Sequence, residues 1–532
     1  MLLIMTKEMM SKAKPLSFST TMRNPDRIAL FLNQILPFEN HTLTDDVIMD
    51  IVRNIIKNKL YKPYYIDRNN NLKEIFYDDD LSFSDDQVEE IIINSPQKHK
   101  EAGFEYGWSS RFDTWYSLPK EFGFLYYEMN KPIKISNIGH MLIDALNEET
   151  PNSKKIQNVF LNSLMKYSTD NPFRKNSNSN VPLLLLLKVI GLLKNDEEEN
   201  GAGVFRQELS LFICWKDDDA NRLYKKIKEI RKNVKFTYSD EYIYDICLEE
   251  LGCITDEEKQ NSKKYYKMSK ICGEAVDEYI RKMRSTGLLS LRGNGRFLDY
   301  NSFEQKKIDY VLKNYSEYIK FENRESYYKY IGEIDNNILV IEEEDNIPKK
   351  DEVKLDTLRR LAKEYSKDFI FNELMLVSGK KESSDKLLKF ISGPIRLEFL
   401  TSIALVQNFN DIMVLPSYPV DDEGLPTMTA GGDTPDIVCY DGEYDSLFEV
   451  TLMCGRSDQV NNEIIPIRRH LLERIKKNNN SFSVFVAPII HEDTKEAIEW
   501  YKHKDNVDII PYTILEMIEE FKIKNNLGEL LN

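Results

Sequence analysis

Two acidic residues near the end of this 532-residue chain have the spacing of a divalent-metal site. Asp436 opens an apolar run at 437–440, and Glu449 lies inside the next run, with a short polar turn at 441–444 between them. The two runs are expected to be neighbouring antiparallel strands, which places both acids at the same end. Carboxylate oxygens bind hard divalent cations, and the backbone carbonyl of Val450 is a candidate third ligand. We therefore expect an Mg²⁺ site, in which Mn²⁺ can substitute.

The order of these residues resembles the motif of PD-(D/E)xK nucleases, with Pro435-Asp436 followed by Glu449-Val450. The lysine of that motif is replaced here by Thr451, so the group that activates water stays open. An acid that only caps a turn is the simpler reading of Asp436. Metal binding is favoured because both acids adjoin apolar residues, where an unpaired charge is costly. Phosphodiester hydrolysis needs water activation and charge neutralisation, and bound Mg²⁺ supplies both.

Two basic segments, 215–235 and 262–296, interrupt a chain whose formal net charge is −16. Such runs are often solvated helix faces, but beside nuclease carboxylates they favour nucleic-acid contact. The periodicity predicts a helix over 274–285 and, after Gly287, a hairpin with strands at 288–291 and 296–298. This layout is typical of a winged helix-turn-helix. The predicted outward or exposed basic residues, and so the expected DNA contacts, are Lys263, Lys264, Arg281, Lys282, Arg284, Arg292 and Arg296.

A further DNA contact is expected near the N-terminus. Asn24 and Pro25 predict a helix start, and the apolar residues that follow have the period of an amphipathic helix. Helix formation does not require Thr20, Thr21 and Arg23, which stand just ahead of it and could contact a phosphate.

Length and composition predict several domains and a reducing cytoplasm. The six cysteines form no CxxC pair, so neither a zinc site nor a disulfide framework is indicated. The longest apolar run, 183–193, is interrupted by Lys188 and is too short to span a membrane.

The fold class predicted from these patterns is multidomain α+β. The expected parts are an N-terminal helical DNA-recognition subdomain (1–175), a winged-helix subdomain (176–301), a partly helical linker (302–356) and an α/β nuclease domain (357–532). The last part should contain a mixed central sheet covered on both sides, with strands near 437–440, 447–453, 482–487 and 507–510. Its helices are expected around 355–376, 383–408, 466–477 and 493–502. The segment 175–180 is expected to be an exposed loop.

The chain resembles the AlwI family of type IIS restriction endonucleases. The resemblance rests on the order Phe18-Ser19-Thr20-Thr21-Met22-Arg23-Asn24-Pro25, then Gly431-Gly432, Pro435-Asp436-Ile437 and Glu449-Val450-Thr451-Leu452. It implies recognition of a short asymmetric site in double-stranded DNA and cleavage a few base pairs outside it. It also implies a bacterial or archaeal cytoplasm and a cognate DNA methyltransferase. Cleavage of the second strand would use a transient homodimer or a small nuclease subunit.

The resemblance implies a catalytic set made of Glu398, Asp436, Glu449, Glu463 and His470. Glu398 would be an acidic metal ligand on the helix that precedes the strands. His470 would act as general base or orient water in place of the missing lysine. A solvated acid at Glu398, and a His470 that only faces the DNA backbone, are the simpler readings. Pro466 is expected to break or kink any helix that joins Glu463 to His470.

Two other functions stay open. One is a strand-specific nicking endonuclease with the same site, because the chain holds a single set of nuclease residues. The other is a winged-helix DNA-binding protein whose nuclease domain is inactive.

Overall fold

The structure is a computed structural model of a mostly helical α+β protein with a mixed five-stranded sheet near its C-terminus. It describes residues 14–18, 25–78, 81–148, 153–199, 201, 203–234, 236, 238–315, 317–341, 347–431, 434–456 and 459–531. The chain forms two compact units, one of residues 1–55 and 96–345 and the other of residues 56–95 and 346–532. Within the described ranges, no helix is both long and apolar enough to cross a membrane.

The first unit is built mainly from helices. Its N-terminal and middle elements are α2 (Pro25–Ile35), α3 (Asp45–Lys57, which runs into the second unit), α7 (Trp108–Glu121), β1 (Leu125–Tyr126), β2 (Lys134–Ile135), α8 (Asn137–Asn147) and α9 (Ser153–Leu164). Helix α2 begins at the expected proline, and Ile28, Phe31, Leu32 and Ile35 on its apolar face are fully buried. The periodicity of this segment therefore predicted its packing face correctly.

A helix and hairpin follow one another in the second half of this unit. The elements of this part are α10 (Pro182–Lys194), β3 (Val204–Phe205), α11 (Leu209–Cys214), α12 (Ala220–Val234), α13 (Asp240–Glu250), α14 (Asp256–Ser262), the π-helix η4 (Ser269–Glu274), α15 (Ala275–Arg284), β4 (Leu289–Arg292) and β5 (Phe297–Tyr300). The hairpin β4–β5 is antiparallel, as expected, and β3 adds a third strand beside β5. Gly293 and Gly295 at its tip have φ of 60° and 82°, which glycine adopts without steric cost.

Two expectations for this unit were wrong. Lys282 was expected on the outer face of α15, but it is only 2% exposed. Glu278 and Tyr279 of the same helix are buried as well, so α15 packs against its surroundings over more than one face. The loop 175–180 was expected to be exposed, but Asn178 and Asn180 are buried. Their amide groups donate to the Trp215 carbonyl oxygen at 2.6 and 3.2 Å. These bonds give a buried backbone carbonyl the hydrogen-bond partners that it would otherwise lack.

In its described residues, the segment 302–356, expected to be a partly helical linker, contains the 3-10 helix η5 (Ser302–Glu304) and four α-helices: α16 (Gln305–Asn314), α17 (Arg324–Gly332), α18 (Asn336–Val340) and the first part of α19 (Ile347–Glu364). The boundary between the two compact units falls inside this segment, at 345/346. Tyr327 and Ile331 of α17 are fully buried, so this part of the chain packs within the first unit.

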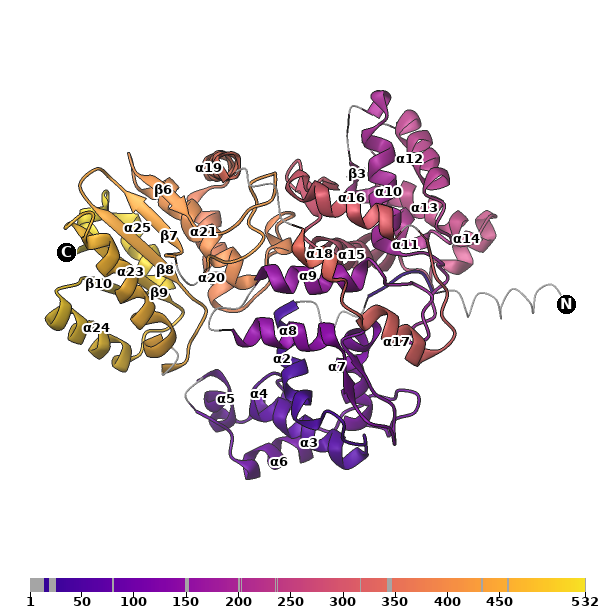
Figure 1. The fold of residues 1–532 in the computed structure, drawn as a ribbon, viewed down its shortest axis with the longest axis horizontal. Coiled ribbons are helices and arrows are strands. Elements are labelled where there is room, and N and C mark those ends of the chain that lie inside the picture. The colour runs from indigo at the N-terminus through magenta and orange to yellow at the C-terminus, as the bar shows by residue number, and fades with distance from the viewer. Residues whose placement is uncertain are drawn as a thin grey trace. The chain divides into compact units, whose positions relative to one another are not determined.

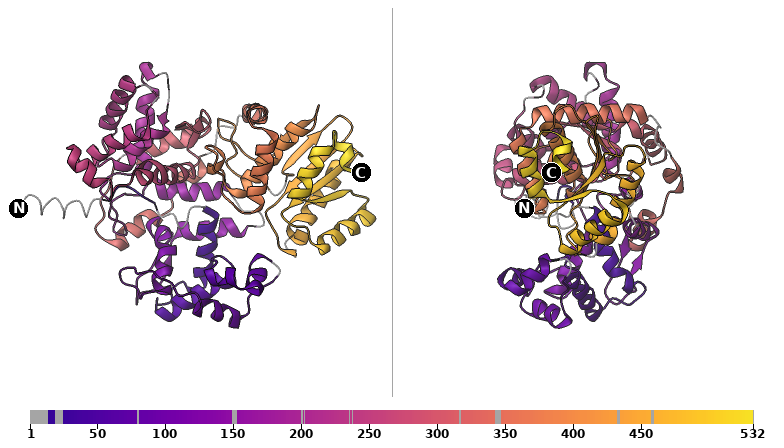
Figure 2. Two further views of the ribbon diagram at one scale, coloured as in Figure 1. Left: turned by 180° about the vertical axis from the view of Figure 1, so that it is seen from behind. Right: turned by 90° about the vertical axis from the view of Figure 1, so that its left-hand side faces the viewer.

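The second unit contains the sheet and the helices that cover it (Figures 1 and 2). Its helices are α4 (Tyr64–Arg68), α5 (Asn70–Tyr77), α6 (Asp85–Ile93), the rest of α19, α20 (Lys367–Ser378), α21 (Gly393–Asn408), the π-helix η7 (Gln459–Ile464), α23 (Ile465–Ile475), α24 (Glu492–Asp505) and α25 (Ile514–Ile523). The expected helix 355–376 is interrupted because Ser366 caps α20, accepting a hydrogen bond from the Phe369 amide at 3.2 Å. The expected helix 383–408 begins only at Gly393.

The five strands lie in the order β10-β9-β8-β7-β6. They are β6 (Met413–Pro416), β7 (Ile437–Tyr440), β8 (Asp445–Val450), β9 (Ser481–Ala487) and β10 (Ile509–Thr513). The pairs β6–β7 and β7–β8 are antiparallel, whereas β8–β9 and β9–β10 are parallel, so the predicted mixed sheet is confirmed. The hairpin β7–β8 was expected from the sequence, whereas the short edge strand β6 was not.

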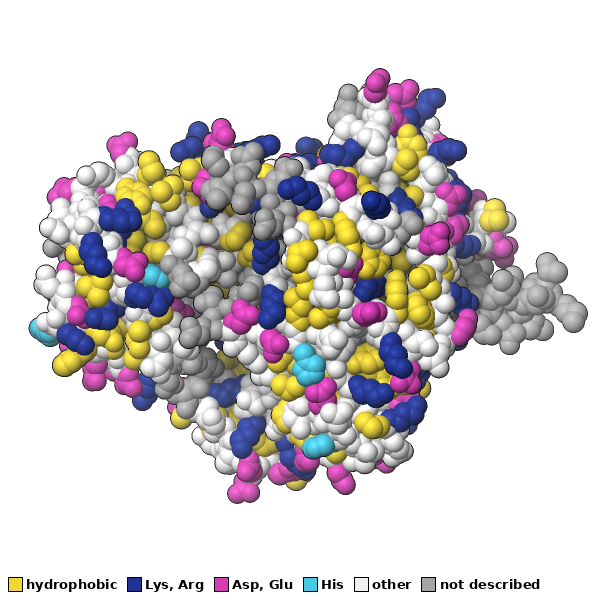
Figure 3. All heavy atoms as spheres, in the orientation of Figure 1, with side chains coloured by type: hydrophobic (Ala, Val, Ile, Leu, Met, Phe, Trp, Pro, Cys, Tyr) yellow, Lys and Arg dark blue, Asp and Glu magenta, His cyan; other side chains and the backbone are white. Residues whose placement is uncertain are grey.

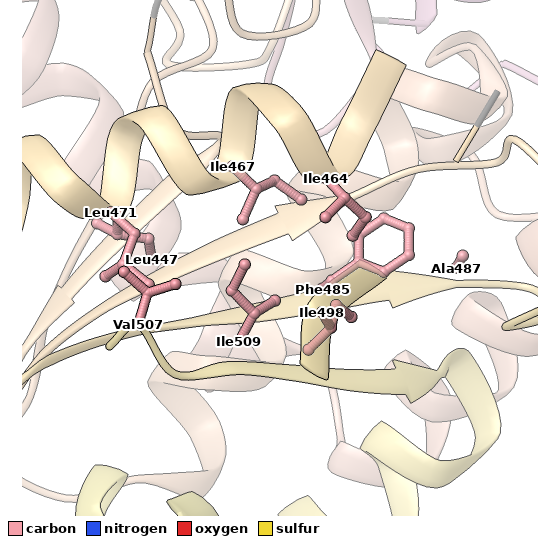
Figure 4. Packing of buried hydrophobic residues seen from close by; sticks show 9 residues of the cluster. All are labelled: Leu447, Ile464, Ile467, Leu471, Phe485, Ala487, Ile498, Val507 and Ile509. Atoms are coloured by element: carbon pink, nitrogen blue, oxygen red, sulfur yellow. The ribbon is translucent and has the colours of Figure 1, made fainter. Parts of the chain in front are cut away.

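Alternate residues of β8 face opposite sides of the sheet. Leu447 joins a core formed with η7, α23, β9, α24 and β10, and Figure 4 shows its members. Phe448 points the other way and packs edge-on against Phe521 of α25, with ring centroids 6.1 Å apart. Glu449 is therefore on the side of Leu447, the face that α23 covers.

Candidate active site

Asp436 and Glu449 lie side by side at one end of the hairpin. Ile437, the first residue of β7, pairs with Phe448 of β8, so the preceding Asp436 lies beside Glu449. The Asp436 amide donates to Glu449 Oε2 at 3.3 Å, and the Val450 amide donates to Asp436 Oδ2 at 2.8 Å. The structure thus brings together the two acids that the sequence singled out.

Glu398 reaches the same region from α21. It is only 4% exposed, and its Oε2 accepts a hydrogen bond from the Ala430 amide at 3.0 Å. The simpler reading, that Glu398 is a solvated acid, is therefore wrong. Its pKa is raised by burial and by the neighbouring charges of Asp436 and Glu449, so the three carboxylates share one electrostatic environment.

Glu463 is held near the site by a π-helix. The π-helix η7 continues directly into α23, and Pro466 occupies the first turn of α23, where its missing N–H costs no hydrogen bond. The expected break between Glu463 and His470 is therefore absent. The side chain of Thr451, the residue at the position of the motif's lysine, favours the charged form of Glu463, but burial raises the pKa of Glu463 overall.

His470 faces Glu449. Its Nδ1 lies 2.9 Å from Glu449 Oε1, and the two residues are 8% and 6% exposed. This burial argues against a histidine that only faces a DNA backbone. The neighbouring Arg468 and Arg474 form ion pairs with Asp505 and Asp445.

The site concentrates negative charge away from water. Burial, with repulsion from Glu449 and Glu463, raises the pKa of Asp436 well above its usual range. Burial likewise raises the pKa of Glu449 to about 8 and that of Glu463 to about 7. Their charged forms are disfavoured until a positive charge arrives.

The donor chemistry of the site fits a hard divalent cation, because every carboxylate offers oxygen. Across the described residues, however, no group of three or more His, Cys, Asp or Glu side chains has metal-binding spacing. Asp436, Glu449 and Glu398 each direct one oxygen at a backbone N–H. The set therefore fits the ion in the chemistry of its donors.

The expected DNA contacts divide into three groups. Thr20, Thr21 and Arg23 lie outside the described residues. Lys263, Lys264 and Arg296 are exposed, and Arg281 and Arg284 are partly exposed. Lys282 is buried, and Arg292 donates to Asp299 Oδ2 and to the Tyr300 carbonyl oxygen, both at 2.8 Å. On the face seen in Figure 3, Lys and Arg are interspersed with Asp and Glu, so a DNA-binding surface would be local.

A family comparison identifies the chain. The family model described as AlwI restriction endonuclease matches residues 120–376 and 350–520. The chain belongs to this family. It is therefore a restriction endonuclease, a class of deoxyribonuclease, as its sequence motifs predicted.

Comparisons with solved structures find restriction endonucleases. The small subunit of the heterodimeric enzyme R.BspD6I is 21% identical, with 30% of this chain and 85% of that chain covered and a TM-score of 0.25. FokI, alone and bound to DNA, is 13% identical, with 98% of both chains covered and a TM-score of 0.25. A search of curated proteins finds no match.

One residue that supports the site, Gln459, was not predicted from the sequence. Gln459 is fully buried and donates to the carbonyl oxygens of Met453 and Ile489 at 3.2 and 2.8 Å. Thr494 in turn donates to Gln459 Oε1 at 2.9 Å. These bonds hold the segment that follows Thr451, and no local pattern indicates partners so far apart in the chain.

If the carboxylates bind a divalent cation, the ion should stabilise the folded protein. Millimolar Mg²⁺ or Mn²⁺ should raise the melting temperature of the protein, since an ion at about a hundred times its Kd adds about 2.7 kcal/mol. Asp436→Asn and Glu449→Gln should abolish the rise, because each removes a carboxylate that would bind the ion. Differential scanning fluorimetry measures it, with Glu443→Gln, an exposed acid of the same hairpin, as the control. An unchanged rise in both site variants would exclude metal binding here.

Proposed function

We propose that this endonuclease is of type IIS, recognising a short asymmetric site in double-stranded DNA and cutting a few base pairs outside it with Mg²⁺. The observation that carries the proposal is the convergence of Asp436, Glu449 and His470 at the end of the β7–β8 hairpin, in a chain of the AlwI family. The raised pKa values of these acids support it, because strongly perturbed carboxylates mark functional sites.

The ion would be held by Asp436, Glu449 and Glu398, with the Val450 carbonyl as a further ligand. Mg²⁺, or Mn²⁺ in its place, lowers the pKa of bound water and neutralises charge on the scissile phosphate. His470 is the proposed general base. Donation from its Nδ1 to Glu449 would make Nε2 the nitrogen that accepts a proton. Glu463, through Thr451, would share in orienting the water.

DNA recognition is assigned to residues 1–301, which lie in the first unit except for 56–95. The proposed parts of the whole chain are the N-terminal subdomain (1–175), the winged-helix subdomain (176–301), the linker (302–356) and the nuclease domain (357–532). The order of α15, Gly287 and the hairpin β4–β5 supports the winged-helix assignment. The proposed contacts are Thr20, Thr21, Arg23, Lys263, Lys264, Arg281, Arg284 and Arg296. Lys282 and Arg292 are instead assigned to packing and to the hairpin's own ion pair.

The chain has one proposed nuclease site, and this bears on the partners that it needs. Two cuts in a duplex need two sites, or one site used twice, so a transient homodimer is proposed for the second strand, with a small nuclease subunit as the alternative. A cognate DNA methyltransferase is expected to protect the host genome in a bacterial or archaeal cytoplasm.

Removing either central acid should separate binding from cleavage. Asp436→Ala and Glu449→Ala are expected to abolish cutting of plasmid DNA while site-specific binding persists, because the proposed recognition residues lie in the other unit. Sequencing of the wild-type ends would locate the cut relative to a recurring site. Near-wild-type cleavage by either variant would refute the nuclease assignment.

The strand count is tested by titration on supercoiled plasmid. First-strand cutting should rise linearly with protein concentration, and second-strand cutting more steeply, because it recruits another copy. Gel separation of nicked and linear DNA measures both. Nicked product alone, even in large protein excess, would identify a nicking enzyme instead, unless a small partner subunit restores linear product.

The hairpin β4–β5 is the proposed wing, and it is expected to contact a DNA phosphate through Arg296. Arg296→Ala should weaken binding to all DNA sequences alike and reduce the salt slope by about one, since one released counterion is lost. Lys329→Ala on α17, 74% exposed at its side chain, makes the same charge change elsewhere in the unit and is the control. Fluorescence anisotropy across salt concentrations measures the slope. Equal slopes for the two variants would place the wing away from DNA.

A further inference from the structure

We propose that Arg474 is a positioning residue for the active site, which fixes helix α23 on strand β8 and so holds His470 against Glu449. This inference rests on the proposed function, since it assigns His470 and Glu449 to cleavage.

Two polar links join α23 to β8. His470 Nδ1 lies 2.9 Å from Glu449 Oε1, and Arg474 Nε donates to Asp445 Oδ2 at 2.7 Å. Asn478, just past the helix, also donates to Asp445, with Nδ2 3.0 Å from Oδ1. Asp445 is the first residue of β8 and Glu449 is near its end, so the helix is bound to both ends of the strand.

The spacing of these links couples them. Residues four apart on a helix share a face, and residues an even number apart on a strand share a side. His470 and Arg474 therefore face β8 together, and Glu449 and Asp445 face α23 together. A helix attached at one point can pivot about it, whereas attachment at two points fixes its rotation and its position along the strand.

The apolar core alone does not fix the rotation of α23 or its position along β8. Ile467 and Leu471 pack against Leu447 and Ile509 from the same helix (Figure 4), but apolar contact is non-directional and tolerates sliding. The ion pair is directional, and it is partly shielded from water. The side chains of Arg474 and Asp445 are 21% and 12% exposed, which sets the pair apart from freely solvated surface pairs.

Arg474 also contacts the other strand of the site. Its guanidinium lies 4.6 Å from the centre of the Tyr440 ring, and Tyr440 pairs with Asp445 across β7 and β8. The anchor therefore sits at one end of the two strands whose opposite ends carry Asp436 and Glu449.

The same helix supplies a matched control. Arg468 Nε donates to Asp505 Oδ2 at 2.5 Å, and its guanidinium lies 4.9 Å from the Tyr501 ring centre. Its side chain is 26% exposed and that of Asp505 is 17% exposed, close to the values of the other pair. This second pair joins α23 to α24, which carries no proposed catalytic residue. Arg468→Gln thus removes the same chemical group without touching β7 or β8.

The test compares single-turnover cleavage rates and DNA affinities of full-length variants. Arg474→Gln and Asp445→Asn should lower the rate at saturating DNA by about tenfold to a hundredfold, the cost of a misplaced catalytic group, with unchanged Kd. Arg474→Lys should recover part of the rate, because lysine keeps the charge. Arg468→Gln should cleave at nearly the wild-type rate.

A double variant decides whether Arg474 acts through the histidine. In a His470→Ala background, Arg474→Gln should cause little further loss, since the residue it positions is gone. An undiminished loss there, or equal rates for Arg474→Gln and Arg468→Gln, would overturn the inference. If Arg474→Gln melts well below Arg468→Gln, Arg474→Lys decides instead: slower cleavage at an unchanged melting temperature supports the inference, and an unchanged rate overturns it.

Glu449→Ala separates this inference from the proposed function. If Glu449→Ala cleaves like the wild type, the nuclease assignment itself fails. If it is inactive while Arg474→Gln cleaves normally, only the positioning role fails.

Discussion

Repulsion among buried carboxylates is the constraint on which the second unit depends. Glu398, Asp436, Glu449 and Glu463 influence one another's charge in a region largely closed to water. Such a cluster costs free energy unless each group finds a donor. The fold supplies backbone amides at Ala430, Asp436 and Val450 and a histidine from α23, and the side chain of Thr451 favours the charged form of Glu463. Each donor comes from a different element or bend, so the sheet and its covering helices must stay in register for the acids to remain together.

Two kinds of interaction maintain that register. The apolar core between the sheet, α23 and α24 holds the layers together, and the polar links set their orientation. The link that bears on the acids is Arg474–Asp445, which attaches α23 to β8, whereas Arg468–Asp505 attaches α23 to α24. The π-helix adds a local adjustment, because its wider turn changes the direction of the side chains that precede α23. Glu463 belongs to this turn, and π-turns of this kind occur often at functional sites.

The sequence predicted the parts of the site that local patterns encode. Strand β7 was expected at its observed residues, and acids beside apolar runs pointed to Asp436 and Glu449. Local patterns failed where distant partners decide the outcome. Asn178 is buried because carbonyl groups some 35 residues away need its amide. Lys282 is buried because α15 packs over more than one face. Pro466 does not break α23 because it lies in the first turn of that helix. The sequence did not show this, because the start of the helix could not be placed from local patterns.

The charge of the site also bears on how substrate and ion arrive. A DNA phosphate that approaches these acids, of which Glu398 and Glu449 are buried and Asp436 and Glu463 partly exposed, meets repulsion, and it meets attraction only when a divalent cation lies between them. The chain as a whole carries −16, so any basic surface that offsets this unfavourable field is local. Under the proposed function, the ion therefore serves the encounter as well as the chemistry. The same repulsion among the acids would favour productive binding of DNA at sites that hold Mg²⁺. Separate recognition residues in the first unit would then bind DNA whether or not the ion is present, which links the two-unit construction to the electrostatics of the active site.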